Sequence, residues 1–219
     1  MIKAVIFDMD GVIIDSESIQ SKAFEEVLKE YDKRPIHNKY GIVQTVGIRA
    51  KENWERLKEL YHIDEKIEIL ITKRRKIYQK LIQSECKPMP GLLPALDFLK
   101  RHKLKLAIAS SSNKKNINIV LSKLDIVHYF SVVVSGEEIV NGKPNPDIFL
   151  ETVKRLHAEP KECIVIEDAE SGILAAKAAG MKVIAVPNKY TKHHDFSKSD
   201  IVVDSLDRLN SKFVSKILS

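Results

Sequence analysis

Short continuous apolar runs recur along the chain, and amphipathic segments separate most of them. The runs have the length and composition of strands buried on both faces: Ala4–Phe7, Leu106–Ala109, Val132–Val134, Ile164–Ile166, Val183–Val186 and Ile201–Val203. Apolar residues three and four positions apart predict helices over Leu92–Leu99, Ile117–Leu124, Ile148–Leu156 and Ile173–Ala179. Strands that alternate with helices in this way are typical of α/β proteins with a doubly wound parallel sheet.

The alternation is interrupted once, from about Ser16 to Ser84, where helical periodicity continues without a strand-type run. Prolines 88 and 90 and Gly91 then end the helical pattern. We therefore predict an all-helical cap domain, residues 16–87, inserted into a Rossmann-like catalytic core formed by residues 1–15 and 88–219. A helical domain held by two hinges could act as a lid. A helical decoration that never moves is the simpler alternative.

Composition narrows the class of protein. The 219 residues are 44% hydrophobic, and 36 basic residues against 30 acidic ones give a net charge of +6, with the two signs mixed throughout. A nucleic-acid-binding face would need clustered basic residues, so we expect no nucleic-acid partner, whereas small anionic substrates fit this charge. No segment approaches the ~18 apolar residues of a membrane span. The two cysteines form no metal-binding or disulfide pattern, which favours a reducing, cytoplasmic location.

Polar residues follow four of the predicted strands at the point where each strand ends. In an open parallel sheet, ligands bind at the carboxyl ends of the strands, so these residues are the first candidates for a site. They are Asp8 and Asp10 after the first strand, Ser110, Ser111, Ser112 and Asn113 after the second, Lys143 after the third, and Glu167 with Asp168 after the fourth.

The aspartates among these candidates indicate a metal site. Asp8 and Asp10 are two positions apart, so both project to the same side if the strand conformation continues. Two close carboxylates stay ionised only beside a cation, and Mg²⁺ suits an all-oxygen site. Asp168 would supply a third ligand. Glu167 should point the other way in an extended chain, and it could bind the metal through water or support a ligand.

The remaining strand-end groups are suited to an anion. Ser110 and the Ser111 amide offer donors near a helix start, where the helix dipole favours negative charge. Lys143, between Gly142 and Pro144, could neutralise a transferring phosphoryl group. Taken singly, such groups are typical of caps and turns. Their joint occurrence at four strand ends favours phosphoryl transfer.

These residues also resemble the motifs of a known family, the haloacid dehalogenase-like hydrolases, in the branch of β-phosphoglucomutase and its sugar-phosphate phosphatase relatives. The resemblance rests on Asp8-Met9-Asp10-Gly11-Val12, on Ser110, on Lys143 in Gly-Lys-Pro-Asn-Pro-Asp, and on Glu167-Asp168-Ala169-Glu170-Ser171-Gly172, and it extends over the cap. It implies a Mg²⁺-dependent phosphatase, active as a monomer on a small phosphate monoester such as a sugar or polyol phosphate.

The resemblance also implies roles for individual residues. Asp8 would attack phosphorus and form an aspartyl-phosphate, and Asp10 would protonate the leaving oxygen and then activate water. The Asp8 carboxylate, the Asp10 main-chain carbonyl and Asp168 would bind the metal. Members that cleave carbon–halogen or phosphonate bonds replace the second aspartate of the first motif, so Asp10 speaks against both reactions.

The choice between phosphatase and mutase depends on the cap. Mutases of this branch look as if they carry a histidine five residues beyond the aspartate that is Asp15 here, and this chain has Gln20 at that position. We therefore favour simple hydrolysis and keep a hexose-phosphate mutase as the alternative. Arg49 and Arg74 lie where relatives place basic groups that contact substrate, although an exposed surface role is equally consistent with their sequence context.

Two alternatives come from other classes of protein. A non-catalytic receiver module that is phosphorylated on a strand-end aspartate would explain Asp8, Asp168 and Lys143, but it leaves Asp10 and the inserted cap without a purpose. A nucleotide-binding dehydrogenase is disfavoured because no Gly-x-Gly-x-x-Gly segment follows the first strand.

Overall fold

The computed structural model describes residues 1–46 and 50–209. The chain divides into two compact units, which are Met1–Asp15 with Lys87–Ser219, and Ser16–Cys86. We call them the core unit and the helical unit. The division lies within one residue of the two boundaries expected from the sequence.

The core unit is built on a sheet of parallel strands. Its described residues form β1 (Ala4–Phe7), β2 (Lys105–Ser110), β3 (Val132–Ser135), β4 (Cys163–Glu167), β5 (Lys182–Ala185) and β6 (Ile201–Val202). The strand order is β3-β2-β1-β4-β5-β6, and every neighbouring pair is parallel. This arrangement confirms the predicted doubly wound α/β class.

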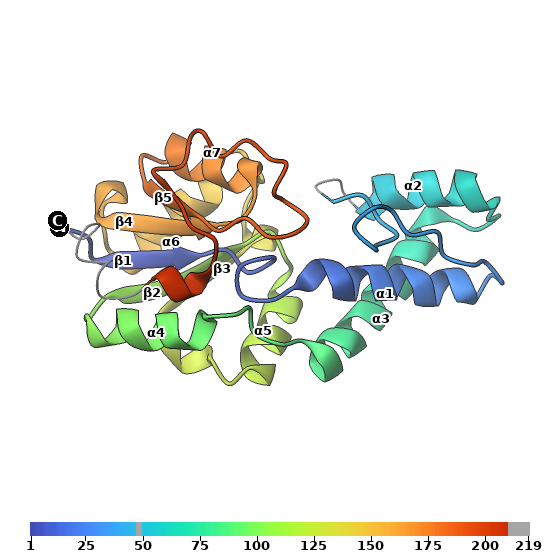
Figure 1. Cartoon of the computed structure of the whole chain (residues 1–219), viewed down its shortest axis with the longest axis horizontal. Helices are drawn as coiled ribbons and strands as arrows, with labels where there is room; N and C mark the ends of the chain where they lie inside the picture. Colours follow the sequence, from blue (N-terminus) through green and yellow to red (C-terminus); the bar gives the residue numbers. More distant parts are fainter. Residues whose placement is uncertain (47–49, 210–219) are drawn as a thin grey trace. The chain divides into compact units, whose positions relative to one another are not determined.

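Helices cover both faces of the sheet (Figure 1). They are α4 (Leu92–Arg101), α5 (Lys114–Lys123), α6 (Asp147–Leu156) and α7 (Glu170–Ala178), with short 3-10 turns at η1 (Val127–Tyr129), η2 (Gly136–Glu138), η3 (Pro160–Glu162) and η4 (Leu206–Arg208). Ala4 and Ile6 of β1 share one apolar cluster with α6 and α7. Val5 and Phe7 alternate with them toward the opposite face and are also buried. Burial on both faces explains why the strands are continuously apolar.

The helical unit contains α1 (Ser16–Lys29), α2 (Ala50–Tyr61) and α3 (Ile67–Glu85), and none of its described residues lies in a strand of the sheet. Phe24 of α1 and Trp54 of α2 pack with ring centroids 4.9 Å apart in the apolar cluster of this unit. Leu57 and Leu70 complete the same cluster from α2 and α3. The helical unit therefore has a small hydrophobic core of its own.

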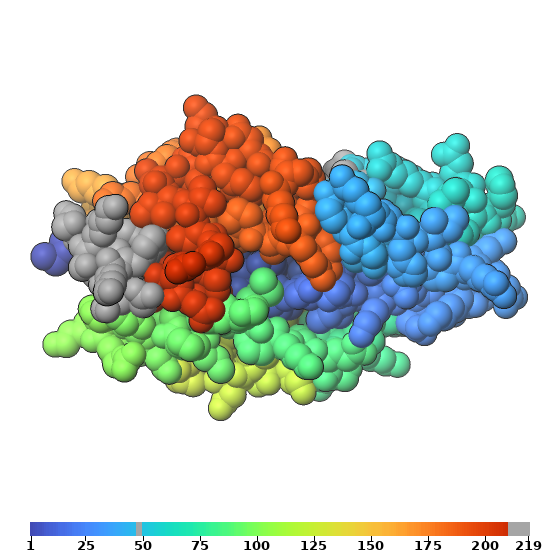
Figure 2. Space-filling view, in the orientation of Figure 1, coloured from blue at the N-terminus to red at the C-terminus, as the bar shows by residue number. Residues whose placement is uncertain are grey.

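The segments that join the two units are tied to each other inside the core unit. The Met89 amide donates to the Ile13 carbonyl at 2.8 Å, and Ile14 forms a β-bridge with Pro88. Further along the chain, η4 packs against α4, and the space-filling view shows the two segments, red and green, side by side (Figure 2). No helix in the described part of the chain is long and apolar enough to cross a membrane.

Candidate active site

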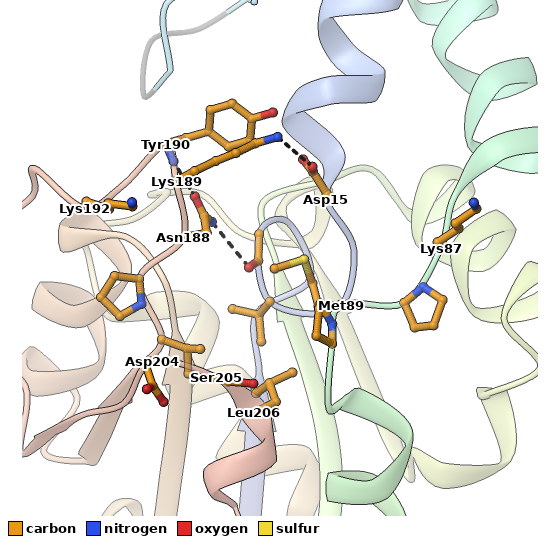
Figure 3. A pocket seen from close by; sticks show the side chains of 16 residues that line it. Asp15, Lys87, Met89, Asn188, Lys189, Tyr190, Lys192, Asp204, Ser205 and Leu206 are labelled. Atoms are coloured by element: carbon orange, nitrogen blue, oxygen red, sulfur yellow. Dashed lines mark hydrogen bonds and ion pairs between the residues drawn. The ribbon is translucent and has the colours of Figure 1, made fainter. Parts of the chain in front are cut away.

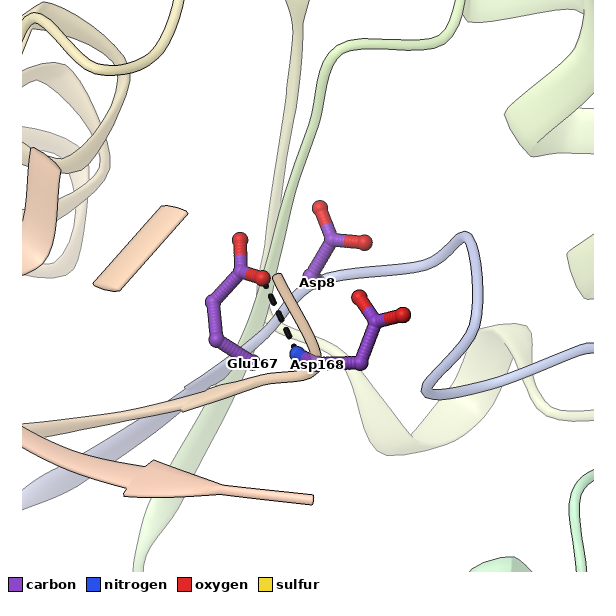
Figure 4. A group of neighbouring side chains, drawn as sticks. All are labelled: Asp8, Glu167 and Asp168. Atoms are coloured by element: carbon purple, nitrogen blue, oxygen red, sulfur yellow. Dashed lines mark hydrogen bonds between the residues drawn. The ribbon is translucent and has the colours of Figure 1, made fainter. Parts of the chain in front are cut away.

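Three buried carboxylates meet at the carboxyl ends of two adjacent strands. Asp8 directly follows β1, Glu167 is the last residue of β4, and Asp168 comes next. One oxygen atom from each of the three side chains lies within 4.8 Å of the others (Figure 4). The register of the sheet produces this cluster, because Phe7 pairs with Ile166 and so brings the two strand ends side by side. The geometry could hold a metal ion.

Lys143 joins this cluster from the loop before α6. Its Nζ donates to Asp8 Oδ1 at 2.6 Å, to Glu167 Oε1 at 2.7 Å and to the Ala109 carbonyl at 3.2 Å. The side chain is only 7% exposed. Burial opposes its positive charge, but the carboxylates of Asp8 and Glu167 outweigh this effect and raise the pKa of Lys143. The ammonium group therefore stays charged beside the carboxylate that is predicted to be the nucleophile.

The cluster has more negative charge than Lys143 can balance. With all three carboxylates ionised, the single ammonium would leave two negative charges in a buried volume. Burial raises the pKa of Asp8 to about 8 although Lys143 opposes the shift, and burial together with Glu167 and Asp8 raises the pKa of Asp168. A divalent cation would balance the remaining charge, and the all-oxygen donor set suits a hard ion such as Mg²⁺. The residues present therefore fit the predicted metal.

The orientation of Glu167 differs from the sequence-based expectation. It does not point away from Asp168, because the strand ends at Glu167 and Ala169 already caps α7, so the two side chains do not alternate. Its Oε1 accepts from Lys143, and its Oε2 accepts from the amides of Asp168 and Ala169 at 3.0 and 3.2 Å. Both oxygens therefore have protein donors, an arrangement that suits Glu167 to anchoring Lys143 and the turn.

Gly172 in α7 makes room for Glu167. A Cβ atom at position 172 would lie 1.7 Å from Glu167 Oε1. Such a contact is far shorter than any van der Waals distance, so a larger residue would displace the carboxylate. The close approach of Glu167 therefore explains why the fourth motif ends in glycine in this fold.

Asp10 lies outside the carboxylate cluster and faces the serines that follow β2. Its Oδ2 accepts from Ser112 Oγ at 2.8 Å and from Ser110 Oγ at 3.4 Å. Its Oδ1 is buried and has no hydrogen-bond partner among the residues that the structure describes. Asp10 therefore keeps one oxygen available for proton transfer. Ser112 is one of the strand-end candidates, but its sequence position alone gave it no role. Its spacing of two positions from Ser110 was the signal that could have placed both hydroxyls on the same side.

The other residues of the serine segment have different surroundings. Ser110 is fully buried, and its Oγ also accepts from the Ser112 amide at 3.0 Å. Ser111 is exposed. The side chain of Asn113, a predicted substrate contact, caps α5 by accepting from the Asn116 amide at 2.8 Å. This capping bond gives Asn113 a structural role.

Two of the substrate residues predicted in the helical unit contact each other. Arg74 donates to Gln20 Oε1 at 2.6 Å, so α1 and α3 bring these two side chains together. The Arg74 guanidinium also lies over the rings of Phe24 and Tyr78, 4.8 and 5.5 Å from their centroids. Arg74 is thus held in place rather than extended into solvent. The third residue, Arg49, lies outside the described residues.

Comparison with known proteins gives consistent matches to one family. Residues 5–186 match the model of the haloacid dehalogenase-like hydrolases. The chain is 34% identical to a phosphorylated carbohydrates phosphatase of Thermotoga maritima, over 83% of each protein. It is 36% identical to a β-phosphoglucomutase of Bacillus subtilis, over 84% of this chain and 83% of the relative. A crystal structure of a β-phosphoglucomutase from Clostridium difficile aligns with a TM-score of 0.76, at 29% identity and over 99% and 96% of the two chains.

A parallel α/β sheet with buried carboxylates and a lysine at its carboxyl edge is an arrangement suited to phosphoryl transfer. The chain belongs to the haloacid dehalogenase-like hydrolase family. The resemblance stated from its motifs is confirmed, as is the predicted enzyme class, a phosphatase.

Proposed function

We propose that this protein is a Mg²⁺-dependent phosphatase that hydrolyses a small sugar or polyol phosphate through an aspartyl-phosphate on Asp8. The observation that carries the proposal is the buried contact of Lys143 Nζ with Asp8 Oδ1 at 2.6 Å, beside Glu167 and Asp168. A buried carboxylate next to a fixed ammonium is suited to attack on a phosphate, because the ammonium offsets the negative charge of the incoming phosphoryl oxygens.

The proposed first step is the transfer of the phosphoryl group to Asp8. An Asp8 carboxylate oxygen forms a bond to phosphorus while the bond from phosphorus to the substrate oxygen breaks. Asp10, in its protonated form, gives its proton to that leaving oxygen, so the sugar or polyol departs as an alcohol. Bound Mg²⁺ would supply electrostatic stabilisation of the phosphoryl oxygens, with Asp8, Asp168 and the Asp10 main-chain carbonyl as proposed ligands.

The proposed second step regenerates the enzyme. Asp10, now a carboxylate, removes a proton from water, and the resulting hydroxide attacks the phosphorus of phospho-Asp8. The acyl-phosphate bond breaks, inorganic phosphate leaves, and Asp8 returns as a carboxylate. The Ser112 bond to Asp10 Oδ2 fixes the carboxyl group while leaving Oδ1 without a partner among the described residues, which supports this double role. Ser110 and the Ser111 amide are the proposed phosphate donors.

The substrate class rests on the relatives and on the helical unit. The Thermotoga relative is named for phosphorylated carbohydrates, which supports a sugar phosphate here. Arg74 is ordered by Gln20 and two aromatic rings, so its guanidinium is preorganised for a polar or anionic substrate group. We propose Gln20, Arg74 and Arg49 as substrate contacts.

A hexose-phosphate mutase remains the second candidate, because a relative at 36% identity is named β-phosphoglucomutase. Gln20 argues against it. Its Oε1 already accepts from Arg74, and an amide cannot gain a proton and a positive charge as an imidazole can.

A phosphate-release assay on a panel of sugar and polyol phosphates tests the proposal. We expect release in the presence of Mg²⁺ and its loss after treatment with a chelator. Interconversion of hexose 1- and 6-phosphates faster than phosphate release would instead establish the mutase. A lasting phospho-Asp8 with no turnover of any ester would favour the receiver alternative and contradict both enzymatic candidates.

A further inference from the structure

Asn188 lies in the loop after β5 and is held in place by that loop. Its side-chain Oδ1 accepts from the Tyr190 backbone N–H at 2.9 Å, and the backbone N–H of Asn188 donates to Thr191 Oγ1 at 3.1 Å. Thr191 is buried, and its amide returns a bond to the Asn188 carbonyl at 3.2 Å. These contacts fix the direction of the Asn188 side chain, because its acceptor atom and its backbone are both engaged locally.

The donor end of the Asn188 side chain reaches Asp168. Nδ2 donates to Asp168 Oδ2 at 2.7 Å and to the Gly11 carbonyl at 3.4 Å. A Cβ atom on Gly11 would lie 2.2 Å from Asp168 Oδ2 and 2.8 Å from Asn188 Nδ2. The loop after β1, the end of β4 and the loop after β5 therefore converge at this point, and a residue larger than glycine at position 11 would separate them.

This contact divides the two oxygens of Asp168 between two tasks. Oδ2 is bound by a neutral amide, which leaves Oδ1 for a cation. A neutral donor fixes the carboxylate without cancelling its charge, whereas a lysine or arginine in the same place would compete with the metal. Partners of this kind orient the ligands of metal sites and set their affinity.

A cavity borders Asn188. Its volume is about 580 Å³, and Asn188, Asp15, Lys189 and Met89 are among the residues that line it (Figure 3). The half-buried Asn188 thus lines the cavity and also bonds Asp168, which is not among the lining residues. If its side chain were shortened, water from the cavity could enter, so the surrounding fold would not have to collapse. Loss of the Asn188 side chain should therefore affect the metal site more than the overall stability of the protein.

We propose that Asn188 is a positioning residue of the metal site, which holds Asp168 so that one carboxylate oxygen faces the ion. The inference rests on the proposed function, because it assumes that the carboxylate cluster binds Mg²⁺. Asn188 follows the fifth strand and lies outside the four motifs that carry the family resemblance.

The test measures Mg²⁺ binding to the full chain by calorimetry, without substrate, for the wild type, Asn188→Ala and Asn188→Leu. We expect the Mg²⁺ dissociation constant to rise roughly 10–100-fold in both variants, the range for lost partners of metal ligands. The Mg²⁺ concentration for half-maximal phosphatase activity should rise in parallel. The substrate KM at saturating Mg²⁺ and the unfolding midpoint in a chelator should change little. Asn188→Leu keeps the side-chain volume, so it separates the lost hydrogen bond from an opened cavity.

Asn141→Ala is the matched control, because Asn141 also donates its amide to an aspartate, Asp147 at 3.0 Å, outside the carboxylate cluster. It should bind Mg²⁺ like the wild type. Wild-type affinity in both Asn188 variants would overturn the role of Asn188 and leave the proposed phosphatase intact. Failure of the wild type itself to bind Mg²⁺ would overturn the metal assignment, and with it this inference.

Discussion

The core unit contains a buried cluster of charged side chains from separate segments, whereas the ion pairs described in the helical unit lie at its surface. Lys143 and its partners Asp8 and Glu167 have side chains no more than 9% exposed. Lys73 of α3 pairs with Glu30, which directly follows α1, and their side chains are 36% and 46% exposed. Buried charges carry a desolvation penalty that their partners must offset. The buried arrangement of the core unit is therefore better explained by catalysis than by stability. The surface pairs require no such explanation.

The two units should differ most in stability and activity when Lys143 and Lys73 are each replaced by methionine. Lys143→Met leaves two buried carboxylates without their cation, so we expect a loss of stability of about 3–5 kcal/mol. Its phosphatase activity should fall by roughly 10²–10³-fold or more. Lys73→Met should cost about 0–1 kcal/mol and leave kcat unchanged. Denaturant unfolding and steady-state kinetics measure both. Equal stability losses in the two variants would contradict the comparison.

A second prediction concerns Gly172. Alanine normally stabilises a helix interior by roughly 0.5–1 kcal/mol relative to glycine. Here its Cβ would meet Glu167 at 1.7 Å, so we expect Gly172→Ala to lower both stability and kcat. Gly142→Ala is the control, since a Cβ there has no heavy atom within 4 Å and should change neither quantity markedly. Thermal unfolding and steady-state kinetics measure whether Gly172→Ala raises or lowers stability and kcat. A variant that is more stable than the wild type and fully active would refute the steric argument.

In the helical unit, Arg74→Leu removes the bond to Gln20 and the contacts with the rings of Phe24 and Tyr78. Cation–π contacts contribute about 0.5–2 kcal/mol each, so we expect a moderate loss of stability. If Arg74 contacts substrate, KM should rise while kcat changes less. Kinetics on the best panel substrate measure this, with Arg75→Leu on the same helix as the control. An unchanged KM would remove Arg74 from the proposed substrate contacts.

The smallest effect should come from a surface pair of the core unit. Burial opposes the ionisation of Asp200, but bonds from Lys177 and the Val183 amide outweigh it and lower the pKa of Asp200. A lowered pKa stabilises the folded state at pH values above the pKa of the unfolded chain, about 3.9. This stabilisation is lost as the pH falls through the pKa of the folded state. Asp200→Asn should thus be less stable than the wild type by under about 1 kcal/mol at neutral pH. Unfolding curves should converge below about pH 4, and a gap that widens there would contradict this account.

The sequence predicted the core better than the details of the site, and the reasons are physical. Continuous apolar runs defined the strands, and β1 begins and ends at the predicted residues Ala4 and Phe7. Strand ends then indicated Asp8, Asp168 and Lys143, because a parallel sheet gathers its carboxyl ends at one edge. The direction of Glu167 depended on where β4 stops, and alternation along an extended chain does not report that position.

Ser112 and Asn188 received no individual roles from the sequence, because their partners are distant along the chain. Ser112 bonds Asp10, 102 positions away, and Asn188 bonds Asp168 from a polar loop that carries no periodic pattern. Asn113 was selected for its place after β2, although its side chain caps α5. Such side-chain pairings arise from the tertiary fold, so local spacing could suggest the direction of Ser112 but could not reveal its partner or that of Asn188.

The central claim is that Asp8 becomes covalently phosphorylated during turnover. The most direct measurement is acid quenching of the enzyme during steady-state turnover of its best substrate with Mg²⁺, followed by mass analysis of the peptide that contains residue 8. The account predicts that the wild-type peptide gains the mass of one phosphoryl group on Asp8 and that Asp8→Asn gains none and loses activity. Full activity in Asp8→Asn, or a phosphoryl group found on another residue, would contradict it.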